Sequence, residues 1–497
     1  MTKPVLVSNE PERGWLAAAV SCLNSRDCML TRRKLLQSAL AISGTAALER
    51  AFGARQPSIP VRLVPGTSAV AIPQNFVGLG YEMSSVARPD LFSSRNAPNV
   101  QLVRDLGREG TVRVGGIVAD FTSYSDTGTA AAEPKKTVIT RACLQQLRGF
   151  LDAVGWTAIW SVNFGRGTLE QALIEVRAVK EALGDRLLAI ELGNEVENYG
   201  RGAEPLRKPP YTFAEFREEY DRWRSAILAA DPGLSFAAPD TAASVEWVEQ
   251  MAADAHGGVQ LLTTHYYRGG QKQATLDQLM SPDPGLAAKL ERLHRASMRC
   301  GVPWRMCETN SFFGGGRPGL SDTFAAALWT LDYLLLLAQS GCAGVNIETG
   351  FNQLGFLSSY SPIRNDDAGQ CTAGASYYGM LAFAMARGTN SGVFPLQSGP
   401  APKQASFYAL GQAGGIQCVV LINKTLDRPL RISLSDVPLR NASSIRLAAP
   451  SAESTVDITL GGSRVDAMGK WSPTEAEPVT GEVLLPPCSA MIVHDHP

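Results

Sequence analysis

Short apolar runs alternate with helical patterns through the middle of this chain, and this alternation constrains the fold more than any other feature. The strand-like runs are residues 76–82, 111–116, 157–163, 187–194, 234–240, 259–267, 303–308 and 343–348. The clearest helical patterns between them are residues 168–183, 212–230 and 322–341. Eight strands, most of them joined by helices, predict an α/β fold, a (β/α)8 TIM barrel. The runs are almost continuously apolar, as expected for strands that are buried on both faces.

The pattern changes near residue 388, where short strand-like runs follow one another with turn residues and no helical pattern between them. This region predicts a C-terminal antiparallel β-sandwich. A strand-like segment before the barrel, within residues 59–73, is expected to pair into the same sandwich. The predicted division is an export leader (1–57), a strand joining the sandwich (58–73), the catalytic barrel (74–387) and the sandwich (388–497).

The N-terminal region carries a possible export signal. Arg32-Arg33 is followed by a short apolar stretch and then by small residues, the layout of a twin-arginine signal. The apolar stretch is too short to span a bilayer. A basic amphipathic helix would look partly similar. We therefore expect a periplasmic or secreted protein that is cleaved between Ala47 and Ala54 and has no membrane association after signal removal.

Composition narrows the classes of partner. Hydrophobic residues make up 45% of the chain and charged residues 19%, which is typical of a packed globular protein. The net charge of −1 provides no field that would attract nucleic acid or an acidic membrane. The nine cysteines show no CxxC spacing and there are only five histidines, so no zinc site is expected. Cys300 and Cys307 are the only pair worth checking for a disulfide.

Two carboxylates follow predicted barrel strands. The fourth strand ends in Gly193-Asn194-Glu195, and the seventh ends at Glu308. Each taken alone is also what an ordinary loop would contain. In a barrel of this kind the chemistry lies at the C-terminal ends of the strands, and curvature brings the ends of strands four and seven face to face. We therefore expect the two carboxylates to face each other across the barrel mouth.

A facing carboxylate pair with no metal ligands nearby is what glycoside hydrolysis requires. One carboxyl protonates the leaving oxygen, and the other attacks the anomeric carbon or activates water. Asn194, next to Glu195, could form a hydrogen bond to the sugar 2-hydroxyl that strengthens in the transition state. The pair therefore predicts a glycosidase that needs no cofactor and no metal, with a carbohydrate as its partner.

Several motifs in this order resemble those of glycoside hydrolase family 79, within the large clan of (β/α)8 retaining glycosidases. They are "GLGYEMSS" (78–85), "VRVGG" (112–116), "LGDRLLAIELGNE" (183–195), "THYY" (264–267) and "CETNSFFGGGRPGLSDT" (307–323). The family contains β-glucuronidases and heparanase-like enzymes. The resemblance covers essentially the whole chain after the export signal. It implies that Glu195 is the acid/base and that Glu308 is the nucleophile.

The resemblance also implies substrate-binding residues. Glu82, at the end of the first strand, matches a residue that bonds the far hydroxyls of the sugar; a buried, satisfied glutamate is the structural alternative. Tyr266 matches a tyrosine near the nucleophile. Because Tyr266 and Tyr267 alternate faces on a strand, only one of them can point inward. We expect Tyr266 to do so, the alternative being a packing role.

The loop from Phe313 to Gly316 matches the segment that receives the carboxylate of a uronic acid, and Tyr360 matches another tyrosine of that pocket. The N–H groups of Gly315 and Gly316 could form a nest for the carboxylate, with Arg317 as a nearby positive charge; a flexible turn is the alternative. This chain departs from the family pattern in three places. Phe313 replaces a tyrosine found in some members, Ile117 replaces a frequent asparagine, and His265 is a single histidine where two are often present.

The resulting hypothesis is a retaining glycoside hydrolase that cleaves β-glucuronides by double displacement, with acid and nucleophile about 5–5.5 Å apart. Two alternatives remain open at this point. One is another retaining β-glycosidase of the clan, such as a β-glucosidase or β-xylosidase. The other is a non-catalytic glycan-binding protein on the same scaffold, which the presence of both Glu195 and Glu308 argues against.

Overall fold

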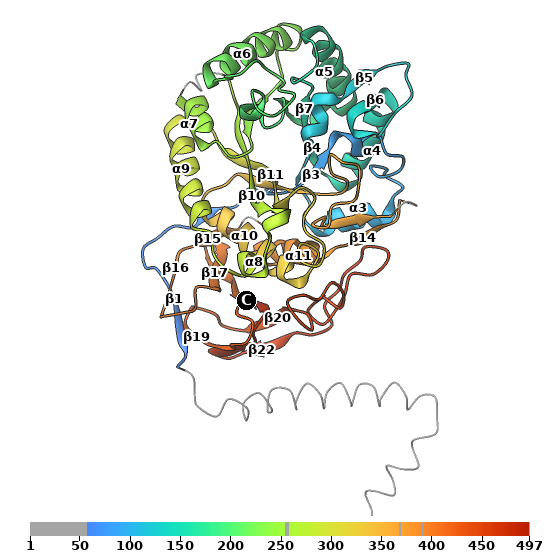
Figure 1. The fold of residues 1–497 in the computed structure, drawn as a ribbon. Helices are drawn as coiled ribbons and strands as arrows, with labels where there is room; N and C mark the ends of the chain where they lie inside the picture. The colour runs from blue at the N-terminus through green and yellow to red at the C-terminus, as the bar shows by residue number, and fades with distance from the viewer. Residues whose placement is uncertain (1–56, 254–257, 367–368, 390, 497) are drawn as a thin grey trace, which may run out of the picture. The chain divides into compact units, whose positions relative to one another are not determined.

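The computed structural model describes residues 57–253, 258–366, 369–389 and 391–496 (Figure 1). Residues from Ser58 onward form one compact unit. The predicted twin-arginine signal lies outside the described residues. Within the described ranges, no helix has the length and apolar character needed to cross a bilayer.

Eight parallel strands close into a barrel, which confirms the predicted (β/α)8 architecture. They are β3 (Val77–Glu82), β4 (Thr111–Gly115), β7 (Thr157–Val162), β8 (Leu187–Leu192), β9 (Phe236–Thr241), β10 (Leu261–Gly270), β11 (Trp304–Phe313) and β12 (Gly344–Glu348). Each coincides with one of the predicted runs, although β10 and β11 extend further than expected. The barrel closes where β12 pairs with β3 and β9 pairs with β10.

Helices follow most of the barrel strands. They are α3 (Ala97–Asp105), α4 (Arg141–Val154), α5 (Leu169–Leu183), α6 (Phe213–Ala230), α7 (Val245–Ala253), α8 (Leu276–Met280), α9 (Pro284–Cys300), α10 (Phe324–Gln339) and α11 (Ala375–Arg387). Capping boxes fix where two predicted helices begin, with Thr168 and Gln171 at α5 and Thr212 and Glu215 at α6. Short 3-10 helices lie in the loops: η1 (Met83–Ser85), η2 (Ile117–Phe121), η3 (Pro134–Lys136), η4 (Gly184–Arg186), η5 (Val196–Asn198) and η6 (Gln271–Gln273).

The remaining strands form a β-sandwich and two small ladders. One sandwich sheet has the order β16 (Leu396–Ser398), β1 (Ile59–Leu63), β19 (Leu430–Asp436) and β23 (Glu482–Leu485). The other has the order β2 (Val70–Ala71), β15 (Gly392–Phe394), β17 (Ala405–Gln412), β18 (Gly415–Asn423), β24 (Ser489–Asp495), β20 (Ala442–Ala448) and β21 (Thr459–Leu460), with β22 (Glu477–Val479) beside β20. The ladders pair β5 (Ser123–Ser125) with β6 (Val138–Thr140), and β13 (Ile363–Asn365) with β14 (Cys371–Ala373).

The segment before the barrel contributes a strand to each sandwich sheet. β1 pairs with β16 and β19, and β2 pairs with β15, so residues on either side of the barrel sequence meet in the sandwich. Helix α10 is buried along most of its length because it contacts the barrel strands β11 and β12 as well as β2 and β15 of the sandwich. The barrel and the sandwich therefore share packed apolar surface.

The interior of the barrel is polar. Arg113 on β4 and Arg305 on β11 are fully buried, and Arg305 donates from Nε to Oδ1 of Asn346 over 2.7 Å. Glycine makes room for these groups, since a Cβ at Gly78 would lie 2.6 Å from Asn346 Nδ2 and 2.7 Å from Arg305 Nη2. Buried charges of this kind are tolerated only when they are paired and hydrogen-bonded.

Candidate active site

The chain turns sharply where β8 ends. Gly193 has φ +83°, and a Cβ there would lie 2.2 Å from the Tyr199 hydroxyl oxygen, so glycine is required. Glu195 itself has φ +50°, a strained conformation for a residue with a side chain. Its N–H donates to the carbonyl of Asp240 at the end of β9 over 2.9 Å. This bond helps to hold Glu195 in the conformation that points its carboxylate into the barrel mouth.

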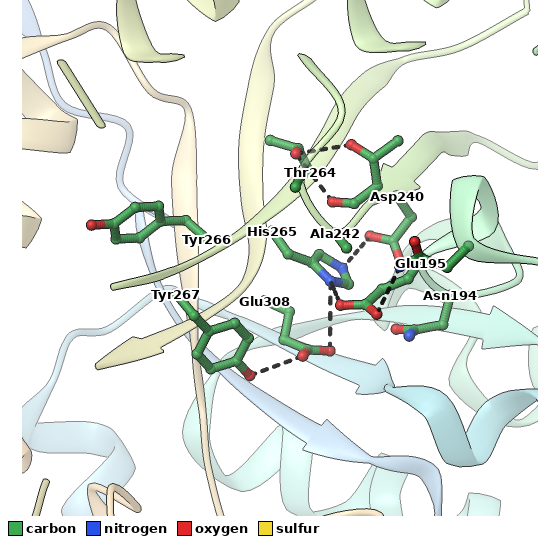
Figure 2. Close-up of polar contacts among 12 residues, drawn as sticks. Asn194, Glu195, Asp240, Ala242, Thr264, His265, Tyr266, Tyr267 and Glu308 are labelled. Atoms are coloured by element: carbon green, nitrogen blue, oxygen red, sulfur yellow. Dashed lines mark hydrogen bonds and ion pairs between the residues drawn. The ribbon is translucent and has the colours of Figure 1, made fainter. Parts of the chain in front are cut away.

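Glu195 and Glu308 point toward each other (Figure 2). One carboxylate oxygen from each, together with a ring nitrogen of His265, all lie within 4.8 Å of one another. The Glu195 side chain is 24% exposed and that of Glu308 is 12% exposed, so both are accessible from solvent. The structure therefore brings together the two carboxylates that the sequence placed on strands four and seven.

A β-bulge directs Glu308. The strand does not end at Glu308, as the sequence predicted, but continues to Phe313. The pairing of β11 with β12 shifts register between Met306 and Thr309, on either side of Glu308. Bulges often re-aim a side chain near an active site, and this one lies where Glu308 turns toward the mouth.

Arg113 connects four side chains beneath the pair. Its guanidinium donates to Glu191 (2.9 Å), Glu308 (2.8 Å), Asn194 (2.8 Å) and Asp240 (2.6 Å). The second oxygen of Glu308 accepts a hydrogen bond from the Tyr267 hydroxyl over 2.9 Å. Glu308 thus receives a donor at each oxygen, and the two hydrogen bonds fix the orientation of its carboxylate.

His265 lies between the two carboxylates and Asp240. Its Nε2 is 2.9 Å from Asp240 Oδ1, and its Nδ1 is 3.4 Å from Glu195 Oε1 and 4.0 Å from Glu308 Oε2. Burial alone would lower the pKa of His265, but the carboxylates of Asp240 and Glu308 raise that pKa well above its ordinary value. The ring is therefore a cation at neutral pH and can donate from both nitrogens.

The orientation of the Asn194 amide follows from its neighbour. Arg113 can only donate, so the Asn194 atom that faces it must be Oδ1. The Nδ2 group then points elsewhere and has no hydrogen-bond partner among the described residues. It is available as a donor beside Glu195, as the prediction for Asn194 requires.

The prediction chose the wrong one of the two adjacent tyrosines. Tyr266 points away from the mouth (Figure 2), where its hydroxyl donates to Asp283 over 2.7 Å and its ring stacks on Tyr333 of α10. Tyr267 is the residue that contacts Glu308. A signal was present in the sequence, because Tyr267 and His265 are two residues apart and so share one face of a strand.

Glu82 lies at the end of β3, buried in the mouth. Its Oε2 accepts from the N–H of Val118 over 2.9 Å. Burial and the nearby charge of Glu308 raise the pKa of Glu82 to about 8. Gly116 makes room for this carboxyl, since a Cβ there would lie 2.1 Å from Glu82 Oε2. Ile117, which follows, is 41% exposed at the start of η2.

The loop after β11 offers fewer free N–H groups than predicted. Gly314, Gly315 and Gly316 all have φ between +76° and +88°, which explains the triple glycine. The N–H of Gly316 donates to the carbonyl of Phe312 over 3.1 Å, so the prediction that it is free for a ligand is wrong. The Gly315 N–H has no partner among the described residues. Arg317 is held by the carbonyl of Ala274, to which Nη1 donates over 2.6 Å.

Aromatic side chains surround this loop. Phe313 is 57% exposed and packs edge-on against Tyr267, with ring centroids 6.3 Å apart. Tyr360 is buried, its ring 6.2 Å from that of Tyr267, and a Cβ at Gly316 would lie 3.0 Å from the Tyr360 ring. Phe313, Gly315, Gly316 and Tyr360 are therefore neighbours, although they come from two separate loops.

Sequence reasoning missed an amide beside this loop. Asn352 is 2% exposed, and its Oδ1 accepts from the N–H of Leu354 over 2.8 Å. Its Nδ2 has no partner among the described residues and lies 2.5 Å from the position of a Cβ on Gly315. Arg113 and Asp240 were also missed as site residues. A charged residue inside an otherwise apolar strand was the available signal for both.

Two groups of metal-binding side chains also lie here, Glu195 with His265 and Glu308, and Glu191 with Asp240 and Cys307. The Arg113 guanidinium already bonds Glu191, Asp240 and Glu308, so a metal ion in either group would face a fixed positive charge. The donor sets therefore fit an ion-pair network better than a metal centre. Cys300 and Cys307 are free thiols and form no disulfide.

The chain is similar in sequence to β-glucuronidases of two fungi. No family model matches the chain. A β-glucuronidase from Aspergillus niger is 26% identical over 338 residues, covering 58% of this chain and 61% of that protein. A β-glucuronidase from Neurospora crassa is 27% identical over 359 residues, covering 62% of each chain. This chain thus spans somewhat less than two thirds of the length of these relatives.

Solved structures match the whole fold. A 4-O-α-L-rhamnosyl-β-D-glucuronidase from Fusarium oxysporum 12S superposes with a TM-score of 0.73 at 20% identity, covering 88% of this chain and 99% of that one. A family 51 arabinofuranosidase from Xanthomonas axonopodis pv. citri gives a TM-score of 0.61 at 14% identity, with coverage of 88% and 99%. At these identities the likeness shows the fold: a (β/α)8 barrel with a β-sandwich, as in these two glycosidases.

Proposed function

We propose that this protein is a retaining β-glycoside hydrolase of glycoside hydrolase family 79 that acts on β-glucuronides. The observation that carries the proposal is the close approach of Glu195 and Glu308, whose nearest oxygens lie within 4.8 Å. Retaining enzymes need a short separation so that one carboxylate can reach the anomeric carbon, whereas inverting enzymes leave room for a water, at about 6.5–9.5 Å.

In the first step Glu308 attacks the anomeric carbon and forms a covalent glycosyl ester. Arg113 and Tyr267, which donate to its two oxygens, keep it oriented until the bond forms. Glu195 gives its proton to the leaving oxygen at the same time. His265, whose Nδ1 is 3.4 Å from Glu195, orients that carboxyl.

In the second step a water molecule attacks the ester from the face that the leaving group vacated. Glu195, now ionised, removes a proton from that water, and the bond to Glu308 breaks. The products are a sugar with retained β configuration and the enzyme with its starting protonation. The Asn194 Nδ2 group, free beside Glu195, is placed to donate to the sugar 2-hydroxyl through both steps.

A uronate carries a carboxylate where glucose carries a hydroxymethyl group, so its pocket requires donors. The loop after β11 supplies the Gly315 N–H, and Tyr360 supplies a hydroxyl. The Asn352 amide adds a donor that offsets the hydroxyl missing at Phe313. The names of the two sequence relatives and of the Fusarium structure support the same substrate class.

The test compares aryl β-glucuronide with aryl β-glucoside. Each donor left unpaired by the glucoside costs on the order of 1–3 kcal/mol, so we expect kcat/KM for the glucuronide to be at least roughly tenfold higher. Equal or better turnover of the glucoside would leave only a retaining β-glycosidase. Absence of turnover on any aryl glycoside would favour the glycan-binding alternative.

The route of export belongs to the same proposal. Arg32-Arg33 and the apolar stretch after it support a twin-arginine signal that delivers the enzyme to the periplasm or beyond. Replacing the pair by Lys-Lys should trap the precursor in the cytoplasm. Normal export of that variant would show that the two arginines serve only as a basic segment.

A further inference from the structure

Besides Glu195, five buried or half-buried carboxyls surround the mouth, and four of these five receive hydrogen bonds. Glu191 accepts from Arg113 and Ser161, Glu308 accepts from Arg113 and Tyr267, and Asp240 accepts from Arg113 and lies against His265. Glu82 accepts from the N–H of Val118. The fifth carboxyl, that of Glu348, receives no hydrogen bond from any described residue, and its Oε2 is buried without a partner.

Glu348 ends β12 and is 4% exposed. It lies two residues after Asn346, which bonds Arg305 inside the barrel, so the two side chains share the inward face of the strand. Its register partner on β3 is Gly80, where a Cβ would lie 2.4 Å from Glu348 Oε2. Glycine at that position leaves the space that the Glu348 carboxyl occupies.

The charges facing Glu348 come from every neighbouring strand. Glu308 on β11 and Glu82 on β3 are acidic, while Arg113 on β4 and His265 on β10 are cationic. Burial raises the pKa values of the nearby Tyr81, Tyr267 and Tyr360 hydroxyls, and the charge of Glu348 raises them further. Both cations are already bonded to other carboxylates, so an ionised Glu348 would be a further negative charge without a donor. Burial, then Glu308 and Glu82, therefore raise the pKa of Glu348 well above its usual range.

We propose that Glu348 acts as a neutral carboxylic acid that donates a hydrogen bond to an acceptor oxygen of the bound uronate. A carboxyl in an apolar or acidic setting can stay protonated at neutral pH and serve as a donor. When Glu348 loses its proton, it becomes an acceptor with a negative charge and repels the uronate carboxylate. Selectivity for uronates over neutral sugars is then greatest at low pH. This inference rests on the proposed function of the same site.

The decisive variant is Glu348→Gln, which keeps the shape and the donor but has no proton to lose. The pH profiles of kcat/KM are measured on aryl β-glucuronide and aryl β-glucoside. In the wild type the ratio of kcat/KM for the glucuronide to kcat/KM for the glucoside should fall at least about tenfold as the pH rises and Glu348 ionises. Repulsion between Glu348 and the uronate carboxylate that is equivalent in free energy to about one pKa unit gives that factor. In Glu348→Gln the fall should be clearly smaller, because Glu348 no longer ionises and only Glu82 and Glu191 keep raised carboxyl pKa values around the mouth. Activity at low pH should stay within about threefold of wild type.

A loss of glucuronide turnover at low pH in Glu348→Gln would overturn the inference, because it would mean that the site needs an ionised carboxylate. A wild-type-like fall of the ratio in that variant would overturn it as well. Glu348→Ala, which removes the donor, should lose glucuronide turnover at every pH.

A measurement independent of turnover separates this inference from the proposed function. Infrared difference spectroscopy at neutral pH should show a protonated carboxyl band that is weaker in Glu348→Gln than in the wild type. Part of the band remains in the variant, because burial and the charge of Glu308 raise the pKa of Glu82 to about 8. An unchanged band would overturn the inference, whatever the enzyme hydrolyses. Failure of the wild type to cleave the glucuronide, with the band assigned to Glu348, would instead reject the proposed substrate.

Discussion

The interior of the barrel and the interior of the sandwich are both enclosed by β-strands, yet they are filled by opposite kinds of side chain. The sandwich core consists of aliphatic residues such as Val61, Val419, Leu421 and Ile432, all fully buried. The upper barrel holds Arg113 with Glu191 and Asp240, which are equally buried but charged. Equally buried side chains therefore stabilise the fold in the sandwich and position charged groups in the barrel.

This difference between the two interiors indicates that the buried charged residues of the barrel have a functional role. Buried ion pairs contribute little net stability, because the cost of removing water from both charges offsets their attraction. Glu195 and Asp240 also have left-handed backbone conformations, with φ +50° and +57°. Left-handed backbone at these two residues, beside a cluster of buried charges, indicates that the barrel mouth is shaped for chemistry at the expense of stability.

The largest effect should come from removing the acid. Glu195→Ala should lower kcat/KM about 10²–10⁴-fold on glycosides with poor leaving groups, because protonation then limits the reaction. On a dinitrophenyl glycoside, whose leaving group needs no proton, the loss should be far smaller. A uniform loss on both kinds of substrate would show that Glu195 is not the acid.

A smaller loss should follow Arg113→Lys. The ammonium group keeps the charge but cannot reach Glu191, Glu308, Asn194 and Asp240 together, as the planar guanidinium does. We expect kcat to fall at least about 100-fold with KM little changed, because orientation of the nucleophile is lost. A rise in KM with kcat unchanged would show that Arg113 serves binding only.

Asn352→Asp should act on selectivity alone. The aspartate keeps the oxygen that accepts from Leu354, so the loop is preserved, but the free amide becomes an anion beside Gly315. We expect kcat/KM to drop about tenfold or more on the glucuronide and to change little on the glucoside. Parallel losses on both substrates would mean that Asn352 has a structural role.

The smallest effect on activity should come from the sandwich. Leu421→Ala removes a fully buried side chain and should lower the free energy of unfolding by about 2–5 kcal/mol. Because no catalytic group lies there, kcat/KM of the folded variant should match the wild type. Chemical denaturation and assays at a temperature where the variant is folded measure both. A loss of turnover in folded enzyme would show that the sandwich shapes the site.

The fold followed from the sequence because it depends on local pattern. Apolar runs of strand length, capping residues such as Thr168 and Thr212, and turn glycines specify each element without reference to distant parts of the chain. The two carboxylates followed as well, since the ends of barrel strands four and seven meet in any such barrel.

The rest of the site depends on contacts that no local pattern specifies. The sequence shows that Tyr267 shares a strand face with His265, but which face of β10 points inward follows only from the closed barrel. The occupied N–H of Gly316 required the turn that follows Phe312. Arg113 bonds residues that lie far from it along the chain, from Glu191 to Glu308. Such pairings become visible only when the barrel is closed.

The central claim is that Glu308 attacks the anomeric carbon while Glu195 handles the proton, and one variant tests it directly. Glu308→Gly should have no measurable turnover of aryl β-glucuronide, because the nucleophile is gone. Azide can enter the vacated space and attack the same face of the sugar, which restores part of the turnover. NMR of the product should show an α-glucuronyl azide. A β-configured azide would mean that the anion entered on the side of the acid/base, and it would reverse the roles assigned to Glu308 and Glu195.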